Sequence, residues 1–439
     1  METRIVIPEH FALDPRAVAA FDEKARGLRA TLQPLPGYRA DAPAGGTITR
    51  LSGAEPVPLG LAGEQYAGAA AFVRRLSQRR EIASLVSEGF ILDSLFGWFE
   101  LTCGSGTSGD SFIEALHESA QKEVRPRRVA TPVEYFTTQR PLQLGDVHIH
   151  QLPTDFFSRM ADAAARAAPD RSEELRTQFG ELHERYALWS FAEITVEAEG
   201  RRARERVLEQ VSRAIVVLRF FSPAAFAPWV ESYFGIRGRA HVPSTDYFEY
   251  EGDWPTIHSS VATDAAINHY VDDRTYPILE ASHFSYLSGI MMASSEDQLR
   301  DVLWRSLHFF DRAIRATVWS EKLVWACAAM DVLLLDHARR DDSVVEAASR
   351  RLAVLYTLST PDELQEMKGH LVGAYEARSA YLHHGRTFDE HKDGNRKILW
   401  KTFLAVRSVI NNAFVLMDRR SLTTHAELLD YLERRHPKE

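Results

Sequence analysis

The chain has 439 residues, of which 45% are hydrophobic, and a formal net charge of −9 at pH 7. This length can bury two or three cores, and the acidic balance argues against a protein that coats nucleic acid through a broadly basic surface. The two cysteines, Cys103 and Cys327, are too few for a disulfide framework and have no zinc-type spacing. The start, METRIVIPEH, lacks the apolar run of a signal peptide, and the longest apolar run, Leu323–Leu335, is too short to cross a bilayer. We therefore expect a soluble, cytoplasmic protein.

The first part of the chain shows signals of both helices and strands. Residues 35–63 are rich in Gly, Pro and Ala, have no helical period and predict a loop or irregular strands. A helical pattern follows over residues 64–100. We expect strands within residues 127–153, with a turn at Gly145-Asp146, and then a helix at about 155–186.

The same mixture continues to about residue 290. The segment LWSFAEITVEAEG, residues 188–200, alternates as a half-buried strand does, and a helix is expected from about Arg201 to Phe221. From Ser222 to Ala281 the sequence is irregular and rich in Tyr, Pro, Asp and His. Within it, the aromatic stretch His241–Ser260 offers a recognition surface without an assignable ligand. Residues 1–290 are thus predicted to be a mixed α/β region of one or two subdomains.

After Ser294 the pattern is helical throughout, with no convincing strand. Three Ser/Thr-x-x-Glu capping boxes mark helix starts, at Ser343–Glu346, Thr360–Glu363 and Thr424–Glu427. The expected helices are 295–317, 320–337, 343–358, 361–382, 394–418 and 424–435. The predicted fold class is therefore α+β, a mixed α/β region followed by an all-α helical bundle at residues 291–439.

One helix of this bundle carries a permanent charge on its apolar face. The apolar stripe of the helix that opens at Thr360 consists of Leu364, Met367, Leu371, Tyr375 and Leu382. Arg378 falls on this stripe, three residues after Tyr375 and four before Leu382. A guanidinium keeps its proton, so on a buried face it needs a carboxylate, carbonyls or a phosphate. Asp331, the one charge in its own apolar run, is a candidate partner, and a structural ion pair is the simplest interpretation.

Two histidines stand where this helix must end. His383 and His384 precede Gly385, which is a natural left-handed C-terminal cap. A histidine near a helix C-terminus also interacts favourably with the helix dipole. Taken alone, the pair is more simply a cap than a catalyst.

The combination YEARSAYLHHG resembles the signature of the HEPN superfamily, all-helical domains marked by an arginine, four to six residues and a histidine. It is most similar to the Apea-like branch, in which Tyr375, Arg378, Ser379, His383 and Gly385 fit in register. The upstream segments EKLVWACAAMDVLLL and ASRRLAVLYTLSTPDEL are similar to earlier helices of that branch. Asp331 is a departure, because the family commonly has a glutamate there. The resemblance covers about residues 297–418.

This resemblance implies a metal-independent endoribonuclease whose site forms where two HEPN domains face each other. It assigns His383 as the general acid/base and Arg378 as the phosphate clamp, both catalytic, with His384, Ser379, Asp331 and Tyr375 in support. An imidazole can move the proton of a 2′-hydroxyl near neutral pH, and a guanidinium can hold phosphate oxygens. RNA substrate, a homodimer and no cofactor or metal are therefore expected. By the same resemblance, the setting is a toxin or anti-phage defence response, and residues 1–290 are a sensor or regulator with an unknown trigger.

Two alternatives to this interpretation stay open at the sequence level. The bundle can be a non-catalytic module for dimerisation or nucleotide binding, with Arg378 structural. The activity can also lie in the first 290 residues, although no motif there is strong.

Other motifs carry less weight. The bare Arg–His spacing also occurs at Arg386–His391, Arg420–His425 and Arg176–His183 without the helical context. Gly104-x-Gly106-x-x-Gly109 has the dinucleotide spacing, between a possible strand FGWFELT and a helix SFIEALHESAQKE, but lacks the later acid and reads better as a flexible loop. His148 and His150 share a strand face without further metal ligands in the sequence nearby. The basic stretch Lys122–Arg128 is expected to be a solvated loop.

Overall fold

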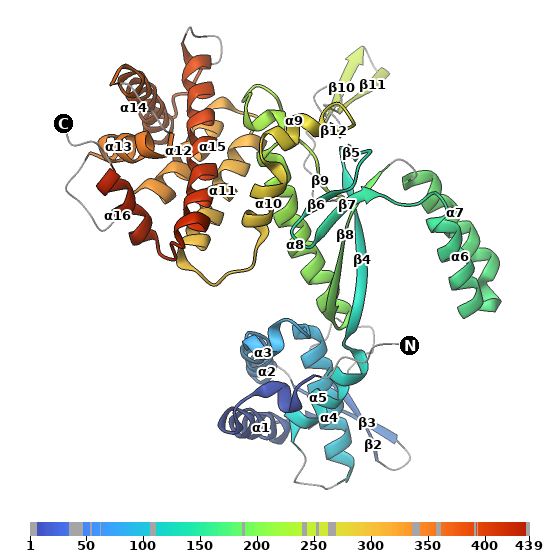
Figure 1. The fold of residues 1–439 in the computed structure, drawn as a ribbon. Helices are drawn as coiled ribbons and strands as arrows, with labels where there is room; N and C mark the ends of the chain where they lie inside the picture. Colours follow the sequence, from blue (N-terminus) through green and yellow to red (C-terminus); the bar gives the residue numbers. More distant parts are fainter. Residues whose placement is uncertain are drawn as a thin grey trace. The chain divides into compact units, whose positions relative to one another are not determined.

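The computed structural model describes residues 7–34, 47–52, 55–61, 63–105, 111–186, 189–238, 244–251, 254–261, 269–335, 343–356, 361–389, 392 and 394–435. Strands and helices are mixed up to about residue 271, and the regular elements described after it are all helices (Figure 1). The predicted α+β class is confirmed. Within the described residues, no helix is both long and apolar enough to cross a membrane.

The chain forms two compact units. The first consists of Met1–Val129 and Ile194–Glu209, and the second of Ala130–Glu193 and Gln210–Glu439. The boundaries fall inside strands β4 (Arg125–Glu134) and β8 (Ser190–Ala198) and inside helix α8 (Gly200–Phe220).

The first unit packs helices around an aromatic core beside a small sheet. Strands β1 (Gln33–Pro34), β3 (Glu55–Gly60) and β2 (Thr47–Ser52) pair in that order, all antiparallel. The helices are α1 (Pro15–Ala30), α2 (Glu64–Ser77), α3 (Arg80–Ala83), α4 (Glu88–Ser105) and α5 (Phe112–Glu123). Their shared core includes Phe72, Phe99 and Phe112. The segment FGWFELT lies inside α4, which confirms its place in the helical pattern predicted over residues 64–100; the strand considered there was wrong, and the helix predicted after it is α5.

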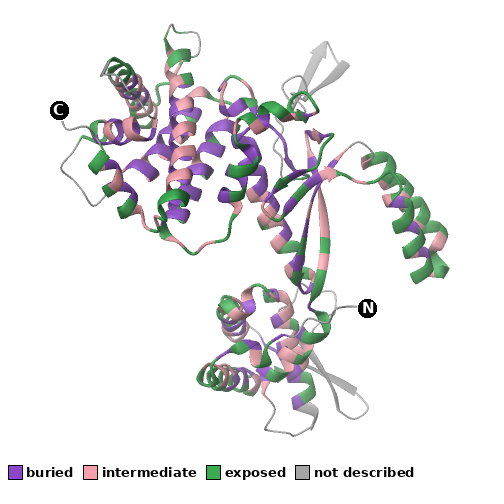
Figure 2. Cartoon of the chain, viewed as in Figure 1, coloured by how far each residue is buried: buried purple, intermediate pink, exposed green. Residues whose placement is uncertain are grey.

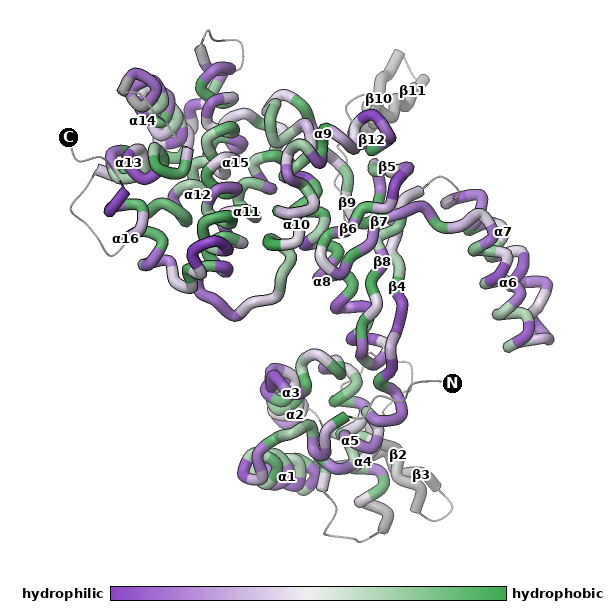
Figure 3. Tube along the Cα trace, viewed as in Figure 1, coloured by the Kyte–Doolittle hydropathy of each residue, from purple (hydrophilic) through white to green (hydrophobic). Residues whose placement is uncertain are grey.

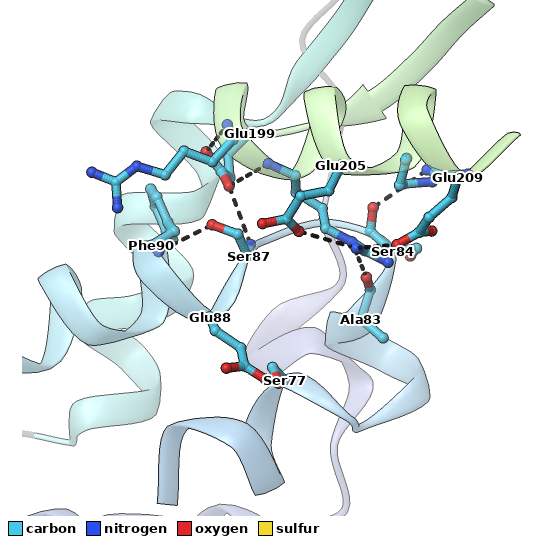
Figure 4. A network of polar contacts seen from close by, with 12 residues as sticks. Ser77, Ala83, Ser84, Ser87, Glu88, Phe90, Glu199, Glu205 and Glu209 are labelled. Carbon is cyan, nitrogen blue, oxygen red and sulfur yellow. Dashed lines mark hydrogen bonds and ion pairs between the residues drawn. The ribbon is translucent and has the colours of Figure 1, made fainter. Parts of the chain in front are cut away.

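A buried carboxylate anchors the segment 194–209 within the first unit (Figure 4). Glu199, only 4% exposed, directly precedes α8 and accepts hydrogen bonds from the backbone N–H groups of Arg201 and Arg202, both at 2.7 Å, and of Ser87 at 3.2 Å. Arg202 also donates Nε to the carbonyl of Ala83, at the end of α3. Burial raises the pKa of Glu199, but these hydrogen bonds outweigh it and the net pKa is lowered. The carboxylate therefore caps α8 and ties it to the start of α4.

The second unit contains a five-stranded sheet in the order β6-β7-β8-β4-β9. Its further strands are β6 (Leu142–Leu144), β7 (Val147–Gln151) and β9 (Gly235–Ile236), and β6–β7, β7–β8 and β4–β9 are antiparallel pairs. The predicted turn lies between β6 and β7. Gly145 there has φ +59°, and a Cβ added to it would lie 2.7 Å from Cβ of Met292, so both backbone and space require glycine.

The second unit contains two further pairs of elements besides this sheet. Strands β5 (Phe136–Thr138) and β12 (His269–Val271) form a parallel pair. Helices α6 (Phe156–Ala167) and α7 (Ser172–Tyr186) pack mainly against each other. Figure 2 shows these two helices mostly exposed, and Figure 3 shows hydrophilic residues along them.

Residues 222–281 are more regular than we expected. Strands β10 (Ser244–Glu251) and β11 (Trp254–Val261) form an antiparallel hairpin in the register Ser244↔Val261 to Glu251↔Trp254, and helix α9 (Tyr276–Ala281) follows β12. The sequence signal was Gly252-Asp253, a two-residue turn pair between runs rich in Tyr, Phe and Thr. Because both strands also carry many polar residues, the sequence does not show the alternation of apolar and polar residues that marks a strand.

The C-terminal bundle agrees closely with the predicted helices. They are α11 (Gln298–Arg315), α12 (Trp319–Leu334), α13 (Val344–Tyr356), α14 (Pro361–His384), α15 (Asn395–Arg420) and α16 (His425–Arg435). Both hydrogen bonds of the capping box before α16 are present. Thr424 Oγ1 accepts from the N–H of Glu427 at 3.2 Å, and the Glu427 carboxylate accepts from the N–H of Thr424 at 3.0 Å. Thr360, of the box before α14, lies outside the described residues.

We expected a domain boundary near residue 290, but the second unit extends across it. Helix α10 (Phe284–Met292) packs against both α15 and β6. Within the same unit, Arg219 of α8 pairs with Asp311 of α11, and these two side chains are 6% and 4% exposed. Residues 291–439 are therefore part of a larger packed body.

We predict that Asp311→Ala destabilises the second unit by about 3–5 kcal/mol, because it leaves the Arg219 guanidinium buried without its carboxylate. Urea unfolding monitored by circular dichroism measures this change. Glu174→Gln removes the partner of Arg171 in a surface ion pair and serves as the control, with no measurable effect expected. Equal midpoints for the two variants would contradict the structural role of the buried pair.

Candidate functional site

Helices α12 and α14 bring three of the predicted site residues together. Asp331 of α12 accepts a hydrogen bond from the Tyr375 hydroxyl at Oδ1, at 2.5 Å, and from Nη1 of Arg378 at Oδ2, at 2.7 Å. Tyr375 and Arg378 lie three residues apart on α14 and so share a face. The expected pair of Asp331 and Arg378 is present, and Tyr375 completes it.

The pair is only partly buried. The Asp331 side chain is 13% exposed and the Arg378 side chain 28%. Arg378 contacts Asp331 through one nitrogen of the guanidinium, and its Cζ lies 5.9 Å from the centre of the Tyr375 ring. The guanidinium is thus held by Asp331 through Nη1, while part of the Arg378 side chain is exposed to solvent.

The surroundings keep the two weak acids nearby protonated. Burial raises the pKa of Tyr375 well above its ordinary value, and the charge of Asp331 raises it further. Burial likewise raises the pKa of the Cys327 thiol to about 12, again with a contribution from Asp331. Tyr375 therefore acts as a hydrogen-bond donor at neutral pH. No motif in the sequence placed Cys327 in this group.

The end of α14 has the predicted cap. Gly385 has φ +62°, its N–H donates to the carbonyl of Tyr381 at 3.0 Å, and the N–H of Arg386 donates to the carbonyl of Ala380 at 3.2 Å. The bond from Gly385 to Tyr381, with Gly385 in the left-handed region, is that of the αL capping motif. Three residues after Gly385, the N–H of Phe388 donates to Oγ of Ser320 at 2.6 Å, which attaches the segment after the cap to the start of α12.

The histidines lie at this capped end and face solvent. His383, His384 and Ser379 are all exposed, and the two imidazole centres are 6.4 Å apart. Leu382 is 53% exposed, so its place on the buried stripe was predicted wrongly; the stripe is buried at Met367 and Leu371 and ends at Arg378. Leu382 lies in the last turn of the helix.

Arg378 and His383 do not converge within one chain. Five residues of α-helix separate them by about 7.5 Å along the axis and about 140° around it. The structure therefore joins Asp331, Tyr375 and Arg378 into one cluster and places the imidazoles beside it, on a different side of the same helix.

The other sequence motifs resolve into structural roles or stay untested. Arg127, in the basic stretch 122–128, donates to the carbonyls of Ala198 and Glu123, and so is not simply a solvated loop residue. Gly106 and Gly109 of the glycine-rich segment lie outside the described residues. His150 of β7 lies with Nε2 at 3.6 Å from Glu193 of β8, an acid that the sequence did not show to be near. Among the described residues, no group of three or more His, Cys, Asp or Glu side chains could hold a metal ion.

Comparisons with known proteins found no matching family model, no matching curated protein and no matching solved structure.

We predict a pH signature for the Tyr375 hydroxyl. Its pKa is raised in the folded chain, so the stability it contributes is complete below the unfolded value near 10 and is lost as pH rises from there toward the folded pKa. Urea unfolding at pH 8 and pH 11 should show a smaller loss for Tyr375→Phe than for the wild type. Tyr431→Phe, on a helix outside this cluster, is the control and should keep the wild-type difference. Identical losses for all three chains would contradict the assigned donor role.

Proposed function

We propose that the protein is a metal-independent endoribonuclease of HEPN type. The observation that carries the proposal is the state of Arg378. Asp331 and Tyr375 fix its position, yet its side chain is 28% exposed, whereas the buried arginines Arg219 and Arg351 are 6% and 5% exposed. Among the described residues, one nitrogen of this guanidinium donates to Asp331, and a fixed guanidinium with further donors suits an anionic ligand better than a purely structural pair does.

In this proposal His383 moves the protons and Arg378 stabilises charge. One imidazole takes the proton of an RNA 2′-hydroxyl, the 2′-oxygen attacks the adjacent phosphorus, and the bond from phosphorus to the 5′-oxygen breaks. The leaving 5′-oxygen receives a proton, so the products are a 2′,3′-cyclic phosphate and a 5′-hydroxyl. Arg378 holds the non-bridging oxygens, whose charge grows in the transition state. Asp331 and Tyr375 position Arg378, and His384 and Ser379 are supporting residues. No cofactor takes part in these steps.

A homodimer would complete the site. One chain presents Arg378 and His383 on different sides of α14, so a phosphodiester held by one guanidinium needs an imidazole from elsewhere. A two-fold axis near the end of α14 would place the imidazoles of one copy by the guanidinium of the other, in a self-complementary contact.

We further propose that the remainder of the chain regulates this activity in a cytoplasmic toxin or anti-phage defence response. An RNase that damages the RNA of its own cell must be restrained, and the part of the chain outside the bundle is large enough to do so. A purified full chain that cleaves total RNA at full rate, with no added factor, would remove the restraining role.

The alternative is a non-catalytic module for dimerisation or nucleotide binding. The cluster itself favours it in one respect, since Asp331, Tyr375 and Arg378 satisfy one another as an ordinary structural ion pair. In that case His383 serves only at the helix end.

We predict that the full chain, with an extract of phage-infected cells as the source of its trigger, cleaves labelled total RNA and tRNA in the presence of chelator and leaves cyclic-phosphate ends, and that its rate without the extract is much lower. Arg378→Ala and His383→Ala should each reduce the rate by at least about 100-fold. The matched controls are Arg176→Ala and His183→Ala on α7, which have a similar spacing but lie outside the bundle, and they should keep the wild-type rate. Gel electrophoresis of end-labelled RNA and mapping of the termini provide the measurement.

Folding and assembly must be checked in parallel. Sedimentation and circular dichroism should show dimers of native helicity for all four variants. A folded, dimeric wild type that leaves RNA intact under every condition, including extracts of phage-infected cells, would favour the non-catalytic module.

A further inference from the structure

The second unit contains a cleft that the proposed RNase chemistry does not use. Its volume is about 670 Å³, and it lies where β4 ends, β5 begins, β7 ends, β8 starts and β12 runs. The described residues that line it are Val133, Glu134, Tyr135, Phe136, Thr137, Gln139, Gln151, Trp189 and Tyr270. They come from four separate parts of the chain.

A strained tyrosine forms one part of this lining. Tyr135 joins β4 to β5 and has φ +58°, a left-handed conformation that costs a bulky residue about 1–2 kcal/mol. The neighbouring pairs hold it there: Glu134 pairs with Gly235, Phe136 pairs with His269, and the N–H of His269 donates to the carbonyl of Tyr135 at 2.9 Å. Glycine would satisfy this bend without strain, so the aromatic ring is retained at a cost and requires another reason.

Two more aromatic rings line the cleft from other segments. Trp189 packs edge-on against Tyr186 with ring centres 5.3 Å apart, and the Arg237 guanidinium lies 5.4 Å from the Trp189 ring and 5.0 Å from the Tyr186 ring. The Trp189 ring is thus held by its contacts with the Tyr186 ring and the Arg237 guanidinium. Tyr270, on β12, is 41% exposed. Tyr135, Trp189 and Tyr270 thus bring aromatic side chains from three separate segments to the lining.

The polar groups of the cleft favour an uncharged ligand that both donates and accepts hydrogen bonds. Glu134 supplies a carboxylate, Gln139 and Gln151 supply amides and Thr137 a hydroxyl. The Glu134 charge is already balanced, since Oε1 lies 3.8 Å from Nε of Arg237 and Oε2 accepts from the N–H of Gly238 at 3.3 Å. None of the described lining residues is Lys, Arg or His, so a phosphate entering the cleft would find no cation among them.

We propose that this cleft binds the base of an unphosphorylated nucleoside. Aromatic side chains stack on the faces of a base, and acceptors such as Glu134 take hydrogen bonds from ring N–H and exocyclic amino groups. A sugar would use only one apolar ring face, and an organic cation would need an unbalanced carboxylate. The site stands on its own residues and does not depend on the RNase activity. In a regulated enzyme it would be the place where a small molecule is sensed.

Isothermal titration of the full chain with guanosine, adenosine, guanosine 5′-monophosphate, maltose and tetramethylammonium tests the proposal. We expect one site per chain for at least one nucleoside, with the monophosphate at least tenfold weaker than guanosine. Tyr135→Gly relieves the strained backbone and removes a stacking ring, so the fold should be kept while nucleoside affinity falls roughly 5- to 150-fold. Trp229→Ala removes a tryptophan that is 42% exposed and lies outside the cleft, and it should leave the affinity unchanged.

Glu134→Gln tests separately whether the Glu134 carboxylate accepts hydrogen bonds from the N–H groups of the base. It keeps an acceptor for Gly238 but loses the carboxylate, so guanosine, with two adjacent donors, should lose more affinity than adenosine. Binding of maltose or tetramethylammonium in preference to nucleosides would overturn the proposal. So would tighter binding of the monophosphate, nucleoside affinity that Tyr135→Gly leaves unchanged, or no binding by any nucleoside at millimolar concentration.

Discussion

Buried cations that donate to main-chain carbonyls hold the second unit together. Arg219 donates to the carbonyl of Phe234, Arg300 to that of Ile290 in α10, Lys322 to that of Ile314 in α11 and Arg351 to that of Leu334 at the end of α12. The last carbonyls of a helix have no partner inside it and carry partial negative charge. A cation from a neighbouring element satisfies them, and this fixes where each helix ends relative to the next. Lys322 is 2% exposed, and this burial lowers its pKa to about 8.

The candidate site is a variation on this scaffold. Arg378 resembles the structural arginines in type and, like Arg219 and Arg351, pairs with a carboxylate, but its side chain keeps contact with solvent. In the proposed function, this incomplete burial leaves the guanidinium accessible to an external anion. The difference between scaffold and site is therefore one of exposure. Residue type alone does not separate Arg378 from Arg351.

Local signals in the sequence predicted the helices. Contacts between segments far apart in the chain could not be predicted from it. The helix limits agree within a few residues because Thr424, Glu427 and Gly385 act on their own neighbours through hydrogen bonds within one turn. The pair of Asp331 and Arg378 could be proposed because both charges interrupt apolar faces. Nothing local marks the approach of Glu193 to His150, or the convergence of Tyr135, Trp189 and Tyr270 on one cleft. The boundary expected at residue 290 failed to coincide with the units for the same reason, since α10 packs on elements far from it in sequence.

The discontinuity of the first unit has a consequence for folding during synthesis. Its two segments, Met1–Val129 and Ile194–Glu209, are separated in the chain by 64 residues that belong to the other unit (130–193). The Glu199 cap on α8 and its bonds to Ser87 can form only after those intervening residues have left the ribosome. Until then the helices within residues 1–129 lack their packing against residues 194–209. The surface that this packing covers is accessible to chaperones and proteases during that time. The two units therefore complete their folds as interleaved processes, and a mutation in either can delay the other.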